Sequence, residues 1–214
     1  MMKKMVIWML AAWLVAGMAM GGILNQDEPG EWTVSGQYWF PGDGDFDLFE
    51  YGVGGAVSYR EWFSFPWGVG LNLGVASWSV DSGASAYKYD KLTEYDGDCL
   101  LIPLGASLYF NVIDWDNWNL LLGTGLQYVF VNSDVRVFNS ESGTKAWQDV
   151  DIDGGLLWNL ELEYEYMLTE SAYVLGGVGY QVDVIRAGSD YDGGELRDTS
   201  FRGAFLRLGA KFLF

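Results

Sequence analysis

Three glutamates alternate along one mostly apolar segment of the chain. Alternate side chains of an extended strand point to the same side, so Glu161, Glu163 and Glu165 are predicted to share one face. Like charges at this spacing repel one another unless cations lie close to them. The candidate partners are Arg60, Arg207 and Lys211 on other segments of the same alternating kind, and Arg207 is expected to pair with Glu161 or Glu163. The charges that we place on this polar face are Glu50, Arg60, Glu161, Glu163, Glu165, Asp183, Arg207 and Lys211.

Two functions fit these eight charges. If the side chains converge in an enclosed interior, they can form a salt-bridge network that fills the interior and makes it rigid. If they line a water-filled passage, they can form a narrow path for ions or small solutes. Five acids against three bases leave a charge of −2 (3 − 5), so a conducting passage would weakly prefer cations.

One residue type that many hydrolases and metal sites use is missing from the sequence. There is no histidine, which excludes hydrolysis by a Ser–His or Asp–His mechanism. The run Asp43, Asp45 and Asp47 resembles the start of a calcium-binding loop, but Leu48 and Gly54 replace the glycine and glutamate that the loop requires. We therefore expect no enzymatic activity, no cofactor and no metal site. Cys99 is the only cysteine, so no disulfide can form within the chain.

Further acids cluster in polar stretches between the alternating segments. The two clusters are Asp90, Glu94, Asp96 and Asp98, and Asp190, Asp192 and Glu195. Such clusters are typical of solvated loops kept soluble by charge. The alternative is that they bind divalent ions that bridge to anionic surface glycolipid.

The first residues predict a secretory leader. Lys3 and Lys4 precede an apolar run over 5–15, and small residues follow it, so cleavage after Ala19 or Gly21 is expected. We assign residues 1–21 to a signal peptide and 22–214 to one barrel domain. Loss of the two lysines leaves 10 basic (12 − 2) against 29 acidic residues, a net charge of −19. This charge argues against binding to nucleic acid, which requires clusters of lysine and arginine.

Eight segments of the mature chain alternate between apolar and polar residues. Their lengths are close to what a tilted membrane-spanning strand needs. They cover residues 31–40, 48–60, 67–78, 99–111, 118–130, 151–166, 172–184 and 201–214.

The two faces of these segments indicate which solvent surrounds them. One face carries large apolar residues and no charge, as in Trp32 to Phe40, Phe49 to Tyr59 and Leu156 to Tyr164, whereas the other carries the charges and many glycines. In a membrane barrel the apolar face points outward to lipid and the polar face points inward. Aromatic residues at segment ends, such as Trp62, Phe65 and Trp67, suit the membrane interface. The alternative, a soluble lipocalin-like carrier, would need an apolar interior.

Connections between the segments alternate in length, as expected for this class. The links near 61–66, 112–117 and 167–171 are short, and those near 41–47, 79–98, 131–150 and 185–200 are mostly long and polar. With an even number of strands, both termini and the short turns are expected to face the periplasm.

The last segment carries the most specific short motif. Arg207, Gly209, Phe212 and Phe214 match the polar-x-Gly-x-x-aromatic-x-aromatic signal by which the barrel assembly machinery recognises its clients. Together with the sequences at 102–110 and 123–130, this motif makes the mature chain resemble the small eight-stranded outer-membrane barrels (OmpA-like, OmpX-like and OmpW-like). The resemblance covers nearly the whole mature chain and selects no subfamily.

The resemblance implies an all-β, eight-stranded antiparallel up-and-down transmembrane β-barrel in the outer membrane of a diderm bacterium. Its expected partners are outer-membrane lipid, lipopolysaccharide and the assembly machinery, and a monomer is expected. We predict a structural or surface-interaction role carried by the long acidic loops, with a narrow channel as the alternative.

Overall fold

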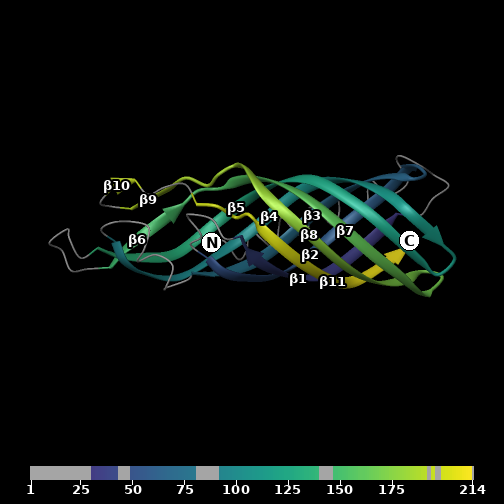
Figure 1. The fold of residues 1–214 in the computed structure, drawn as a ribbon, viewed down its shortest axis with the longest axis horizontal. Helices are drawn as coiled ribbons and strands as arrows, with labels where there is room; N and C mark the ends of the chain where they lie inside the picture. Colours follow the sequence, from purple (N-terminus) through teal and green to yellow (C-terminus); the bar gives the residue numbers. More distant parts are fainter. Residues whose placement is uncertain are drawn as a thin grey trace.

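A computed structural model describes residues 30–42, 49–80, 92–139, 147–191, 194–195 and 199–213. Eight of its strands hydrogen-bond in a closed antiparallel ring, in which each strand pairs with its neighbours in chain order and the last pairs with the first (Figure 1). They are β1 (Glu31–Pro41), β2 (Phe49–Ser64), β3 (Trp67–Val80), β4 (Leu92–Trp115), β5 (Trp118–Asn139), β7 (Gly155–Thr169), β8 (Ala172–Ile185) and β11 (Gly203–Leu213). The expected fold class is confirmed.

The two ends of the barrel differ in their connections. The links at residues 65–66, 116–117 and 170–171 are tight, and they lie with Leu213 at what we call the turn end. At the opposite end, the loop end, β4 and β5 continue beyond the ring (Figure 1). Three short strands, β6 (Trp147–Ile152), β9 (Ser189–Tyr191) and β10 (Gly194–Glu195), extend the sheet from β5.

One predicted strand is divided in the structure. The alternating pattern suggested a single strand over 151–166, but β6 ends at Ile152 and β7 begins at Gly155. Asp153, between them, donates its backbone N–H to the Gly188 carbonyl at 2.8 Å. Asp153 therefore belongs to neither β6 nor β7. β6 pairs with β5 at residues 135–138, beyond the ring, whereas β7 pairs with β5 at residues 118–129, within the ring.

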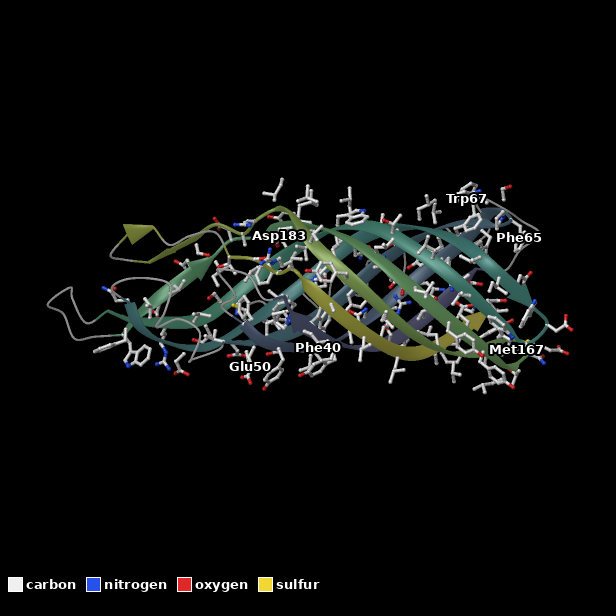
Figure 2. All side chains as sticks on the ribbon, viewed as in Figure 1. Phe40, Glu50, Phe65, Trp67, Met167 and Asp183 are labelled. Carbon is white, nitrogen blue, oxygen red and sulfur yellow. The ribbon has the colours of Figure 1, made fainter. Side chains whose placement is uncertain are left out.

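The outer surface of the ring is apolar and exposed. Leucine, valine and aromatic side chains cover it on every barrel strand, up to 73% exposure at Leu208. Exposed aromatic rings lie at both edges of this belt, as Figure 2 shows for Phe65 and Trp67 at the turn end and for Phe40 at the loop end. An exposed apolar belt of this kind is stable only against lipid, so the inverted arrangement predicted from the sequence is confirmed.

A β-bulge changes the predicted alternation at the start of β2. Phe49 pairs with Val80 and Tyr51 with Ser79, so Glu50 is an extra residue between them. Phe49 therefore turns into the interior, although the sequence placed it outside, and Glu50 is exposed, although the sequence placed it in the lumen. Figure 2 shows Glu50 on the outside of the ribbon, near Phe40.

The described residues include no helix long and apolar enough to cross a membrane.

Candidate functional site: the packed lumen

The lumen near the turn end is occupied by one connected group of ion pairs. Arg60 on β2 is at its centre. The Arg60 Nε lies 2.5 Å from Glu31 on β1, and its Nη1 lies 3.2 Å from Glu163 on β7. Its Nη2 contacts Glu165, which also lies on β7. One guanidinium thus joins strands from different sides of the ring, which its planar fork of donors allows.

Two further cations from β11 complete the group. The Arg207 Nη1 lies 3.1 Å from Glu161, and the Arg207 Nη2 contacts Glu163. The Lys211 Nζ lies 3.1 Å from Glu31 and 2.5 Å from Glu165. Every acid therefore meets at least one cation, and the sequence prediction that Arg207 meets Glu161 or Glu163 holds for both. We call these seven residues the lumen charge cluster: Glu31, Arg60, Glu161, Glu163, Glu165, Arg207 and Lys211.

The lumen charge cluster is almost completely buried. Glu163 and Glu165 have 0% of their surface exposed and Lys211 has 2%. Charges this deeply buried are stable only when paired and hydrogen-bonded. With four acids and three bases the cluster carries −1 (3 − 4), rather than the −2 expected from the sequence.

Glu50 and Asp183 were predicted in the lumen charge cluster and lie outside it, and Glu31 belongs to it without having been predicted. Each difference has a local cause. Glu50 is outside because of the bulge in β2. Asp183 is a hydrogen-bond acceptor for Ser200 and for the backbone N–H of Phe201, so it holds the start of β11 rather than joining the ion pairs. Glu31 was missed because it stands at the first residue of its predicted segment. Its place on the same face as Thr33 and Ser35 was the signal that could have found it.

Aromatic rings cover the cations of the cluster. The Arg60 guanidinium lies 4.7 Å from the ring centre of Tyr109 and 5.4 Å from that of Trp62. The Lys211 ammonium lies 4.2 Å from the ring centre of Tyr173. These cation–π contacts add attraction at a buried site. Trp62 thus faces the lumen, whereas the sequence had grouped it with the interfacial aromatics.

A layer of amides and hydroxyls lies next to the charges. The Gln127 Nε2 donates to Gln181 Oε1 at 3.3 Å, and Gln181 donates to the Phe201 carbonyl at 2.5 Å. The Asn72 Nδ2 donates to Ser107 Oγ at 2.8 Å. A cavity of about 40 Å³ remains within this layer. That is room for a few water molecules and no more.

The lumen toward the loop end is filled with apolar side chains. Trp78, Phe49 and Phe201 pack with ring centres 5.5–5.6 Å apart, and Trp39 lies 6.1 Å from Trp78. These four rings belong to a larger buried cluster that continues to Val137 and Val150 in the strands beyond the ring. The sequence did not predict this apolar layer.

Glycines on the inward face provide room for these rings. A Cβ on Gly52 would lie 2.4 Å from the Trp78 Nε1, and a Cβ on Gly179 would lie 2.3 Å from the Phe205 ring. Both separations are far below van der Waals contact, so any other residue at these two positions would displace the aromatic side chain. The glycine-rich inward face is therefore the complement of the large rings, as expected in a narrow barrel.

The residues of the predicted assembly signal are placed on different faces of β11. Arg207 belongs to the lumen charge cluster, and Phe212 is exposed on the outside at the turn end. A Cβ on Gly209 would lie 2.4 Å from the Val34 carbonyl oxygen, so this glycine is needed for close pairing with β1. Phe214 lies outside the described residues.

The predicted acidic clusters are only partly described. The Arg136 Nη2 lies 2.9 Å from Asp96 in an exposed ion pair, and Asp98 stands opposite Asp134 across β4 and β5. Asp43, Asp45, Asp47, Asp90 and Asp192 lie outside the described residues, as does the leader. Within the described ranges, no three His, Cys, Asp or Glu side chains are arranged to hold a metal ion.

Comparisons with known proteins find the same architecture. No family model matches the chain, and no curated protein matches it. Among solved structures, the outer membrane protein OprG from Pseudomonas aeruginosa aligns with a TM-score of 0.62 and 16% identity, over 87% of this chain and 97% of that chain. A major outer membrane protein from Thermus thermophilus aligns with a TM-score of 0.51 and 14% identity, over 86% of this chain and 99% of that chain. Neisserial surface protein A aligns with a TM-score of 0.50 and 12% identity, over 86% of this chain and 97% of that chain. The chain therefore has the fold of the small eight-stranded outer-membrane β-barrels.

Proposed function

We propose that this protein is a non-conducting outer-membrane barrel whose role is structural or surface-interacting. The observation that carries the proposal is the continuous filling of the lumen. The charge cluster, the amide layer and the aromatic layer follow one another from the turn end to the loop end, and the cavity between them measures about 40 Å³. The described part of the interior leaves no room for a hydrated ion path, so the channel alternative is not supported.

The sheet beyond the ring is the part suited to surface interactions. Its inner face buries Val135, Val137, Val150 and Ile152 against the apolar layer, which makes it continuous with the barrel core. Its outer face exposes Asp96, Asp98, Asp134, Arg136, Asp149 and Asp151. Like charges directly opposite each other weaken a sheet, so this acidic face would be stabilised by cationic partners or by divalent ions that bridge to lipopolysaccharide.

The remaining features of the proposal concern delivery and orientation. Residues 1–21 are a cleaved signal peptide, and the C-terminal motif ending at Phe214 directs the chain to the barrel assembly machinery. The turn end then faces the periplasm and the loop end faces outward. The apolar belt contacts membrane lipid, and the barrel is a monomer without catalytic activity.

Cysteine labelling in intact cells tests this orientation. The natural thiol is first removed as Cys99→Ser, and single cysteines are then introduced as Asp149→Cys on β6 or Asn117→Cys at the turn end, both at exposed positions. A membrane-impermeant maleimide should label the Asp149 variant in intact cells. It should label the Asn117 variant only after the outer membrane is permeabilised. Labelling with the opposite pattern would refute the proposed presentation of the sheet.

A further inference from the structure

The lumen charge cluster contains one acid more than it has bases. Four glutamates meet two arginines and one lysine, so with every group ionised the cluster carries −1 (3 − 4). The four glutamates are at most 7% exposed, so water cannot screen this charge. An unbalanced charge in such a place is costly, and a buried acid avoids the cost by binding a proton.

The side chains around the cluster do not supply the missing positive charge. Within the described ranges, the other arginines are Arg136, Arg186 and Arg202, which lie at the loop end or in the sheet beyond it. β3 has no titratable residue. The side chains that face the cluster from the other strands are neutral at neutral pH: Trp62 on β2, Tyr109 on β4, Asn119 on β5 and Tyr173 on β8.

Glu163 is the acid best placed to hold a proton. It is the middle one of the three glutamates that alternate along β7, and each of the other two lies about 7 Å from it along the strand. Glu163 has 0% of its surface exposed, whereas Glu161 has 7%. Neutral Glu163 therefore removes the repulsion from both neighbouring acids at the position with the least access to water.

A neutral Glu163 leaves every remaining charge of the cluster with a partner. Arg207 keeps Glu161 at 3.1 Å. The other two glutamates share the other two cations, and each contacts both: Glu31 and Glu165 with Arg60 and Lys211. A protonated carboxyl still has acceptor oxygens, so Glu163 can keep its hydrogen bonds from both guanidinium groups.

We propose that the lumen charge cluster is a proton-binding site, and that Glu163 carries the proton at neutral pH. The site makes the closed lumen sensitive to pH, because loss of the proton returns an unbalanced negative charge to its centre. Glutamate in the unfolded chain is ionised at neutral pH. The folded barrel thus binds one proton more than the unfolded chain, so its free energy of unfolding falls as the pH rises toward the point at which the proton leaves. The inference rests on the closed lumen of the proposed function.

Infrared spectroscopy of the refolded protein tests the inference, because the carbonyl stretch of a protonated carboxyl is separated from the bands of carboxylates. Spectra are recorded at neutral pH in a detergent without ester or carboxyl groups. The wild-type protein should exceed Glu163→Gln by the band of one protonated carboxyl per barrel. Glu50→Gln is the matched control, because Glu50 is exposed outside the barrel, and its spectrum should equal that of the wild-type protein.

Two further variants test whether the charge count sets the number of bound protons. Glu161→Gln leaves three acids and three bases, so the band should be lost although Glu163 is still present. Lys211→Met leaves four acids and two bases, so the spectrum should gain the band of a second carboxyl. Heat-modifiable migration on gels confirms that each variant is folded. In urea unfolding, the loss of stability from neutral to alkaline pH should be smaller in Glu163→Gln than in the wild-type protein.

Three results would overturn the inference. Equal spectra of the wild-type protein and Glu163→Gln would show that Glu163 is ionised. A band that persists in Glu161→Gln would show that the charge imbalance does not hold the proton. Stability that depends on the concentration of sodium or potassium, and is unaffected by pH, would show that a metal ion balances the charge. The spectra depend on neither conductance nor orientation in the cell, so failure of the proposed function would be seen separately, in those measurements.

Discussion

Replacing Arg207 with methionine removes one cation from the lumen charge cluster while keeping a side chain of similar length. Arg207 is 6% exposed and contacts both Glu161 and Glu163. Removal of one partner from a buried ion pair costs about 3–5 kcal/mol, because the other charge is left uncompensated. We expect the free energy of unfolding of Arg207→Met to fall by this amount.

The geometry also predicts which second substitution restores stability. Among the described residues, Glu161 forms its ion pair with Arg207 alone, whereas Glu163 keeps Arg60 at 3.2 Å after Arg207 is lost. Neutralising Glu161 as Glu161→Gln in the Arg207→Met background should therefore recover more of the lost free energy than Glu163→Gln does. The comparison is a double-mutant cycle, so volume changes common to both variants cancel.

Urea unfolding from lipid vesicles, followed by tryptophan fluorescence, measures these differences. The reasoning would be refuted if Arg207→Met unfolded within about 0.5 kcal/mol of the wild-type protein, the range of ordinary surface substitutions. It would also be refuted if Glu161→Gln and Glu163→Gln restored the same amount, because the structure gives the two glutamates different numbers of cations.

Three further predictions concern the wall, the core and the C-terminus. Leu208→Arg places a charge on the lipid-facing belt and should lower the free energy of unfolding by about 2–4 kcal/mol. Asp151→Arg in the outer sheet is exposed and stands opposite Asp190, so it should not lower the free energy of unfolding. Equal losses in urea unfolding would argue against a lipid-facing Leu208. Cys99 is fully buried in the apolar layer, so maleimide should modify it only after unfolding, and rapid modification of the folded protein would show that this layer is open. Changing Phe212 and Phe214 together to serine should reduce the amount of protein in the outer-membrane fraction, and an unchanged amount would show that the C-terminal motif is not an assembly signal.

The sequence predicted the ring of strands well because alternation is a local property. Each barrel strand places apolar residues against lipid, and the pattern can be seen without knowing its neighbours. The same pattern identified Arg60, Glu161, Glu163, Glu165, Arg207 and Lys211 as inward-facing residues. Their pairing depends on the closure of the ring, so it could be proposed only for Arg207.

Predictions from the sequence are wrong or missing where the alternation is interrupted and where side chains from several strands meet. The bulge between Phe49 and Tyr51 reverses the alternation, so Phe49 and Glu50 were assigned to the wrong faces. The apolar layer was missed because Trp39, Trp78 and Phe205 come from different strands, β1, β3 and β11, and only the ring brings them together. The outer sheet was missed because β6 merged with β7 in the pattern, and a backbone hydrogen bond from Asp153 separates them.

The electrical conductance of the refolded protein in a planar lipid bilayer tests the closed lumen most directly. The wild-type barrel should insert without producing discrete current steps, because charged, amide and aromatic layers fill its interior. A variant that combines Trp78→Ala, Phe201→Ala and Arg207→Ala removes material from two of these layers and should show steps, which confirms that insertion can be detected. Discrete steps of similar size from the wild-type protein would contradict the account and would make the narrow channel the better description.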